Sequence, residues 1–353
     1  MSMKREILSD MQQHLAAGRP FAVATIISQQ GSTPRMPGTK MVVAEDGTSR
    51  GTVGGGLLEA AVIERAAQVL ETGVPVQMRF KLTAKARETM DMICGGVAEV
   101  LIDRIDPAAP SGGCLARWCR LCAEAGAGVL VTVIEEKSEE RITTAHHILD
   151  DPSPPPAGER LDLKALMAQA AAAATQPQSM AVVRSGALKG VVEFFQPPEP
   201  LLIFGAGHVS QPTAHLAHMV GFRVVVLDDR AEFANRERFP EAERVVVLDD
   251  YHRAMGDLRL DAESFIVIVT RGHLHDQTVL AQALRTPAAY IGMIGSRTKR
   301  DTIYSNLRRQ GFNEADLKRV ASPIGLSIRA QTPEEIAVSI VAQMIQRRSE
   351  IRS

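Results

Sequence analysis

A glycine-containing turn between an apolar stretch and a helical stretch constrains this chain more than any other feature. Residues 201–204 read LLIF, the next three read GAG, and residues 209–220 have the composition of a helix. Gly205 can make a tight turn, and Gly207 has no Cβ to keep a ligand from the backbone. The helix start offers unpaired N–H groups to an anion. The pattern predicts a strand–turn–helix unit that binds the phosphate of a nucleotide-like ligand; a glycine-rich turn without a ligand is the alternative.

The residues around this turn both favour and qualify nucleotide binding. Asp228 ends the next apolar stretch, 23 residues after Gly205, where an acidic residue usually binds a ribose hydroxyl. His208 lies inside the turn and is a further candidate for ligand contact. Ser210 stands at the third glycine position of the dinucleotide pattern, which puts ordinary dinucleotide binding in doubt. Binding of NAD(P) or another nucleotide therefore stays open.

Short apolar stretches alternate with helical stretches through the rest of the chain. Such a pattern is typical of a parallel sheet that helices cover on both faces. We therefore predict an α/β fold class, with a C-terminal Rossmann-like parallel sheet domain over residues 201–353. The expected strands are residues 201–204, 222–227, 245–248, 265–269 and 290–294.

Two of these strands run into polar loops at the edge of the sheet where ligands bind in such folds. Their candidate ligand-binding residues are Arg271, His273 and His275 in the first loop, and Gly295, Ser296 and Arg297 in the second. An arginine suits a phosphate or carboxylate, and histidines can transfer protons or bind a metal. The alternatives are a turn in which Asp276 caps a helix, and a solvated basic first turn.

The first 105 residues indicate an N-terminal α+β domain. Its expected helices are residues 6–17 and 57–70, and its expected strands are residues 21–28, 39–44, 76–82 and 97–102. Gly54, Gly55 and Gly56 precede the second helix and are candidate ligand contacts, because three glycines let a ligand approach the backbone. Flexible hairpin loops are the alternative. Residues 106–195 are expected to complete this domain, and residues 196–200 to form a linker.

The cysteines leave two questions open. Cys94 precedes two glycines and is a candidate for handling sulfur or a soft metal, or else a buried structural residue. The other three have the spacing of an iron–sulfur loop, but the residues between them favour a helix: Cys114, Cys119 and Cys122.

Composition narrows the class of protein. The net charge of -1 gives no global attraction to nucleic acid or to an anionic membrane. The N-terminal thirty residues have no signal-peptide pattern, and no apolar stretch approaches a membrane span. We expect a cytoplasmic protein without a disulfide framework.

Taken together, the motifs resemble the XdhC/CoxI family of molybdenum-hydroxylase accessory proteins. The resemblance covers nearly the whole chain except the middle segment. It is carried by ATIISQQGSTPRMPGTKMVV, GTVGGGLLE, MICGGVAEVLID, LLIFGAGHVSQ, VVVLDDRAEFANRERFP, VTRGHLHDQTVL, YIGMIGSRTKR and ASPIGLSIRAQTPEEIAVSI.

The resemblance implies a molybdenum cofactor chaperone. Such a protein binds the cofactor (molybdopterin), protects it while a cysteine desulfurase supplies sulfur, and delivers it to a molybdenum hydroxylase apo-enzyme such as xanthine dehydrogenase. Analogy also suggests a homodimer. Some relatives carry a cysteine where this chain has Leu57, which leaves Cys94 as the candidate thiol. An NAD(P)-dependent oxidoreductase and a redox or metal-sensing protein are the alternatives.

Overall fold

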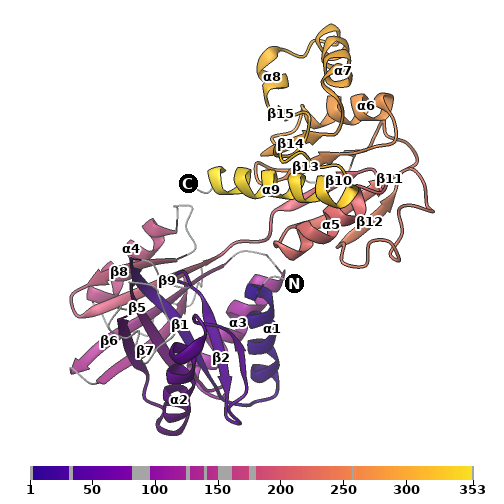
Figure 1. Ribbon diagram of the computed structural model, residues 1–353. Coiled ribbons are helices and arrows are strands. Elements are labelled where there is room, and N and C mark those ends of the chain that lie inside the picture. The colour runs from indigo at the N-terminus through magenta and orange to yellow at the C-terminus, as the bar shows by residue number, and fades with distance from the viewer. Residues whose placement is uncertain are drawn as a thin grey trace. The chain divides into compact units, whose positions relative to one another are not determined.

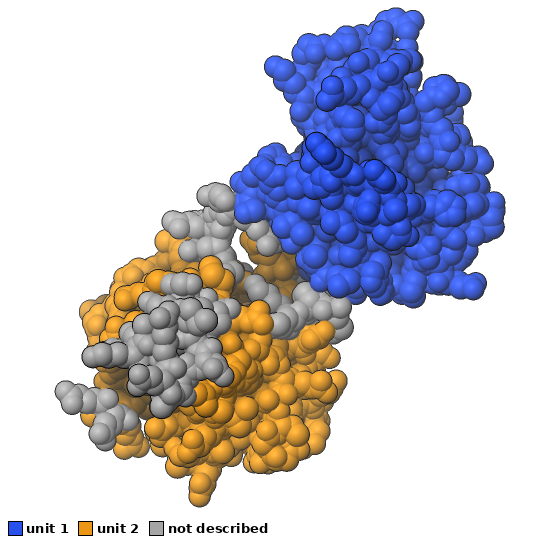
Figure 2. Space-filling model, viewed as in Figure 1, with its two compact units in different colours: residues 1–2, 198–353 blue, residues 3–197 orange. Residues whose placement is uncertain are grey.

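The computed structural model describes residues 3–31, 35–81, 96–124, 128–138, 141–149, 161–174, 180–256, 258 and 260–351. The chain divides into two compact units, coloured separately in Figure 2. Unit 2 contains residues 3–197 and unit 1 contains residues 198–353. The predicted α/β class is confirmed. The described residues contain no helix with the length and apolar character needed to cross a membrane.

Unit 2 is built from two antiparallel sheets. The five-stranded sheet has the order β3-β2-β1-β5-β4 and the four-stranded sheet the order β7-β6-β9-β8. The strands are β1 (Phe21–Gln30), β2 (Lys40–Ala44), β3 (Ser49–Gly51), β4 (Val76–Lys81), β5 (Val97–Ile105), β6 (Gly128–Ser138), β7 (Arg141–Ile148), β8 (Met180–Ser185) and β9 (Leu188–Phe195). The helices are α1 (Met3–Ala16), α2 (Gly56–Thr72), α3 (Pro110–Glu124) and α4 (Leu161–Ala173).

The two sheets of unit 2 share an interior that is partly apolar and partly charged. Buried aliphatic side chains from both sheets form one cluster, Ile27, Leu101, Ile134 and Val191. An ion pair and a hydrogen bond also join the sheets: the Nζ of Lys40 lies 2.8 Å from Glu193, and Nε2 of His146 is hydrogen-bonded to Asp103 at 2.9 Å. Buried polar and charged groups are tolerated only when they are partnered, so these contacts favour one way for the sheets to face each other.

Unit 1 contains the predicted parallel sheet, of six strands in the order β12-β11-β10-β13-β14-β15. The strands are β10 (Pro200–Phe204), β11 (Arg223–Asp228), β12 (Arg244–Val247), β13 (Phe265–Ile268), β14 (Tyr290–Met293) and β15 (Val320–Ala321). The helices are α5 (Ser210–Met219), α6 (His273–Ala283), α7 (Arg297–Arg309), α8 (Glu314–Lys318) and α9 (Pro333–Ile351).

Helices cover both faces of this sheet, as Figure 1 shows. One buried cluster joins the sheet to α5 and α9, and another joins it to α6 and α7. The chain runs outward from β10 through β11 to β12, and then returns to β13 on the other side of β10. This reversal of direction is the position where ligands bind in open α/β sheets.

Candidate functional site

The turn after β10 has the close contacts that the sequence predicted for Gly205. Its amide donates to the Leu227 carbonyl at 2.7 Å, and its φ is +107°. A Cβ at this position would collide with the carbonyl oxygen of Val269. Only glycine satisfies both the backbone angle and the contact. The turn therefore lies directly against the carboxyl end of β13.

Three consecutive backbone amides follow this turn without an acceptor. Within the described residues, the N–H groups of Gly207, His208 and Val209 make no hydrogen bond, and α5 begins at Ser210. A Cβ at residue 207 would meet nothing within 4 Å. The start of a helix with free amides and open space before it suits an anion such as phosphate.

Ser210 explains how the turn does without a third glycine. Its side chain is fully buried, and its hydroxyl donates to the Gly205 carbonyl at 2.5 Å. The hydroxyl thus satisfies a carbonyl inside the turn. The departure from the dinucleotide pattern is a local hydrogen bond that stabilises the turn.

Asp228 lies at the end of β11, but its oxygens are already engaged. Oδ2 accepts from the Ala206 amide at 2.7 Å and from Nη2 of Arg230 at 3.0 Å. Oδ1 accepts from the amide and the Nε of Arg230 at 3.0 and 2.9 Å. Burial acts to raise the pKa of Asp228, but the hydrogen bonds from Arg230 and Ala206 outweigh it and hold the pKa below its usual value. In this arrangement Asp228 fixes the turn.

Arg230 and Arg238 both contact residues of the turn or residues next to it. The guanidinium of Arg230 lies over the Phe233 ring at 3.9 Å, and that of Arg238 at 5.2 Å. Arg238 also donates from Nη2 to the Ala206 carbonyl at 3.5 Å. Ala206 is therefore held through both its amide and its carbonyl, which leaves the amides from Gly207 onward free for a ligand.

The three predicted residues of the loop after β13 have different surroundings. Arg271 donates to Asp229 at 2.8 Å, which joins this loop to the end of β11. The ring of His275 packs against Tyr251 with centroids 4.8 Å apart, whereas His273 is exposed at the first position of α6. Tyr251 is only 2% exposed, and burial together with nearby Asp228 and Asp229 raises its pKa.

Asp276 is fully buried behind this loop. Its Oδ1 accepts from the amide and the hydroxyl of Thr270 at 3.1 and 2.5 Å. Lys299 forms an ion pair with its other oxygen. Burial raises the pKa of Asp276, although Lys299 and Thr270 act in the opposite direction. Asp276 lies within α6, whose N-cap residue is Gly272, so it is not the N-cap of this helix. Its hydrogen bonds with Thr270 hold the loop in place.

The loop after β14 places its predicted residues at the start of α7. Ser296 is the N-cap and its hydroxyl accepts from the Lys299 amide at 3.2 Å. Gly295 has a φ of +150° and packs on the aliphatic part of Lys299. Arg297 is exposed. This loop is therefore linked through Lys299 to Asp276 and to the loop after β13.

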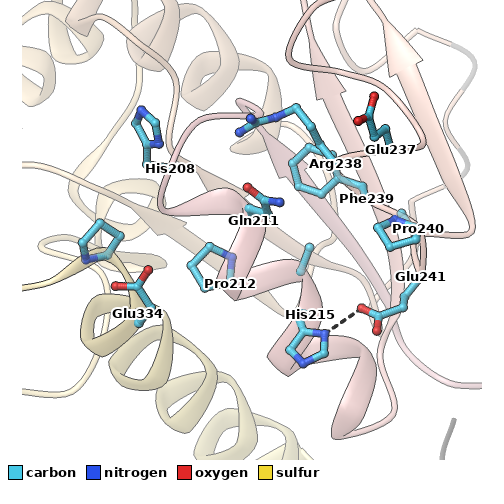
Figure 3. A pocket seen from close by; sticks show the side chains of 13 residues that line it. His208, Gln211, Pro212, His215, Glu237, Arg238, Phe239, Pro240, Glu241 and Glu334 are labelled. Carbon is cyan, nitrogen blue, oxygen red and sulfur yellow. Dashed lines mark hydrogen bonds and ion pairs between the residues drawn. The ribbon is translucent and has the colours of Figure 1, made fainter.

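A pocket of about 500 Å³ opens beside the turn, on the α5 side of the sheet. It is lined by α5, the segment 237–242 and the first residues of α9. Figure 3 shows Arg238 and His208 at one end, Gln211 in the middle and a hydrogen bond between His215 and Glu241 at the other end. That pair has an Nδ1–Oε2 distance of 2.8 Å.

The glycines predicted in unit 2 form one strained turn. Gly54, Gly55 and Gly56 have φ values of +141°, +80° and +59°, and Gly55 is the N-cap of α2. Leu57 follows them, 45% exposed. Cys94, the candidate sulfur-handling thiol, lies outside the described residues.

The remaining cysteines lie in α3, as the sequence favoured. Cys119 and Cys122 are buried in an apolar cluster, and burial raises the pKa of each thiol to about 12. Among the residues that the structure describes, no group of three or more His, Cys, Asp or Glu side chains is arranged to hold a metal ion.

Sequence reasoning missed several residues at this site. Arg230, Arg238 and Phe233 come from the stretch between β11 and β12, where no helix or strand is formed. The only feature of the sequence that could have indicated these residues is the pair of arginines with a phenylalanine between them. Tyr251 gave none, because a single aromatic residue after a strand is more often part of a core.

Two family models match the chain. A model of the XdhC Rossmann domain matches residues 201–344, and a model of the XdhC and CoxI family matches residues 14–81. The chain is also similar to a crystal structure described as a xanthine dehydrogenase from Bacillus halodurans. The TM-score is 0.78 at 27% identity, over 99% of this chain and 96% of the other.

Three curated relatives cover most of the chain. It is 27% identical to a probable xanthine dehydrogenase subunit of Bacillus subtilis over 93% of both chains. It is 22% identical to the molybdenum cofactor insertion chaperone PaoD of Escherichia coli, over 96% of this chain and 87% of PaoD. It is 24% identical to the uncharacterized protein YqeB of Escherichia coli over 93% of its length, and this match spans 43% of YqeB.

Proposed function

Because the chain belongs to the XdhC and CoxI family, we propose that it is an accessory protein of molybdenum hydroxylases. It binds the molybdenum cofactor as cargo, protects it during sulfuration and delivers it to an apo-enzyme of the xanthine dehydrogenase or aldehyde oxidoreductase class. The similarity to PaoD, whose name is that of a molybdenum cofactor insertion chaperone, supports this role.

The observation that carries the proposal is the row of free amides after Gly205. The pterin of the cofactor ends in a phosphate or a nucleotide, and three unpaired N–H groups at the start of α5 suit that group. The guanidinium of Arg238 at the same turn adds a charged donor. These features suit binding of cargo and require no turnover.

Sulfuration and assembly are the finer parts of the proposal. We propose that a cysteine desulfurase supplies the sulfur, that Cys94 is the thiol that receives it, and that the protein acts as a homodimer. Leu57 occupies the position where some relatives carry a cysteine, so this chain needs another thiol for any relay. A Cys94→Ser variant should still bind cofactor but yield a client with less sulfurated cofactor.

An NAD(P)-dependent oxidoreductase is the second candidate, and the parallel sheet with its reversal beside β10 favours it. The engagement of Asp228 weighs against it, because both of its carboxylate oxygens already accept hydrogen bonds from Ala206 and Arg230. Hydride transfer from NAD(P)H to an acceptor, measured with purified protein, would support this alternative.

Delivery to a client tests the proposed function. Cofactor-loaded protein is mixed anaerobically with a molybdenum-free apo-xanthine dehydrogenase, and recovery of xanthine oxidation is followed. We expect faster and more complete recovery than with free cofactor. Gly207→Asp places a carboxylate at the free amides and should abolish the advantage, whereas Gly207→Ala is the matched control for folding. Equal recovery with free and with protein-bound cofactor would contradict the proposal.

A further inference from the structure

The pocket beside α5 begins at the free amides and leads away from the edge of the sheet. Its lining includes His208 from the turn, Gln211 from α5 and Arg238 from the facing segment. Figure 3 shows Arg238 extending toward the side where His208 lies. This end of the pocket therefore combines His208 and Arg238 with the carboxylate of Glu237, beside the turn that carries the free amides.

Arg238 has spare capacity to bind an anion. Its Nη2 makes one long bond to the Ala206 carbonyl, and its Nε is buried with no partner among the described residues. A guanidinium has five N–H donors, so several remain for a ligand. A phosphate placed at the free amides would lie next to these donors, and the phosphoryl oxygens would accept from both.

Three carboxylates also line the pocket. Glu237 lies beside Arg238, Glu334 lies at the start of α9, and Glu241 is hydrogen-bonded to His215, as Figure 3 shows. Carboxylates accept hydrogen bonds and suit a ring that carries N–H groups. The pocket therefore offers the donors of Arg238 and His208 to a phosphate, and carboxylate acceptors to a heterocycle.

The route along the edge of the sheet, which dinucleotides take in this fold, is occupied by protein contacts. Asp228 uses both oxygens on Ala206 and Arg230. Arg271 is paired with Asp229, and His275 is packed on Tyr251. A ligand whose phosphate binds at Gly207 finds open space on the α5 side instead.

We propose that the pocket between α5, the segment 237–242 and the start of α9 holds the body of the ligand, and that Arg238 and His208 clamp its terminal phosphate. The ligand class is a phosphomonoester of an N–H-rich heterocycle. Naming it the pterin of the molybdenum cofactor rests on the proposed function. The chain thus has a dinucleotide-type turn, but its ligand lies in the pocket beside α5 and not along the carboxyl edge of the sheet.

The test compares a blocked pocket with a blocked sheet edge. Gln211 is exposed on α5 within the pocket, so Gln211→Trp fills the pocket without disturbing the core. Arg271→Trp is the matched control at the edge, where the side chain is also exposed. Each variant is titrated calorimetrically and anaerobically with molybdenum cofactor, after thermal unfolding has shown that it is folded.

We expect Gln211→Trp and Arg238→Gln each to weaken cofactor binding by about tenfold or more, and Arg271→Trp to change it by less than about threefold. Weakening by Arg271→Trp alone would overturn the pocket and leave the proposed function intact. If the unaltered protein binds no cofactor, the proposed function fails.

Titration with guanosine 5′-monophosphate then tests the pocket independently of the proposed function. Guanine shares the 2-amino-4-oxopyrimidine edge of a pterin. Binding that the two pocket variants weaken and the Arg271 variant leaves unchanged supports the inference. Absence of binding, or the reverse pattern among the variants, overturns it.

Discussion

Two glycines only one residue apart have opposite constraints at this turn. Gly205 has a positive φ and a backbone carbonyl against its Cα, whereas Gly207 has ordinary backbone angles and open space beside it. The first is needed for the fold, and the second leaves open space beside the free amides. The sequence pattern named both residues but did not separate these roles.

Alanine substitutions should separate the two roles. Gly205→Ala forces a Cβ against Val269 at an unfavourable φ, so we expect it to lower the local free energy of unfolding by about 2 kcal/mol or more. Gly207→Ala should change it by less than about 0.5 kcal/mol. Hydrogen exchange of the β10 and β11 amides measures both. Equal protection in the two variants would show that the contact with Val269 is not formed.

Asp228 gives the turn a pH-dependent component of stability. Its folded pKa lies below the ordinary value of 3.8, so its contribution is present above that value and is lost as the pH falls through the folded pKa. Asp228→Asn should cost about 2–4 kcal/mol near neutral pH, because it leaves Arg230 without its charged partner. Urea unfolding of both proteins should show a difference that is constant down to about pH 5 and shrinks below about pH 4. A difference independent of pH would show that the cost of the substitution does not come from loss of the carboxylate charge.

At the scale of the elements, α3 decides what its cysteines can do. The spacing of Cys114, Cys119 and Cys122 is compatible with a cluster-binding loop, but the intervening Trp118 and Leu115 give one face of a helix an apolar surface. The helix buries that face, and the thiols of Cys119 and Cys122 with it. The cysteines therefore lie in an amphipathic helix and not in an iron–sulfur loop, as the residues between them indicated.

The thiols of α3 should be inert in the native protein. In a variant with Cys94→Ser and Cys114→Ser, the two remaining thiols have pKa values raised by burial to about 12. At pH 8 only about one molecule in ten thousand carries the thiolate at each. An aromatic disulfide reagent should therefore label neither in native protein and both in urea. Rapid labelling of the native variant would refute the burial of this face.

The regular elements of the parallel sheet were predictable, and its irregular parts were not. Five strands have apolar cores of three or more residues, so composition alone indicated them. In the part of the chain that the structure describes, the helices expected on either side of β12 are not formed, because the segments before and after it contain turns and bends. Strand β15 was missed because it has two residues and exists only by pairing with β14. The strands β8 and β9 were missed as well, since the alanine-rich helix before them gave no sign of a second sheet.

The candidate site was predictable to a similar extent. Residues at the ends of strands, such as Gly205 and Arg271, follow from the rule that ligands bind at the carboxyl edge. Arg238 and Phe233 reach the turn from a segment without regular structure, and only tertiary contacts place them there. Asp228 was located by its spacing, but its hydrogen bonds depend on how Arg230 folds back.

At the scale of the whole molecule, the chain combines two units with separate cores. The apolar clusters of unit 1 contain only residues from 201 onward, and those of unit 2 only residues before 198. The similarity to the Bacillus halodurans structure extends over 99% of the chain, so it includes residues of both units.

The central claim is that this protein binds the molybdenum cofactor through the amides that follow Gly205. The most direct test is anaerobic isothermal titration of the ligand-free protein with molybdenum cofactor, with Gly207→Asp as the variant and NAD as the competing ligand. We predict saturable cofactor binding that the variant loses, and no comparable binding of NAD. Binding of NAD without binding of the cofactor would contradict the account and favour the oxidoreductase.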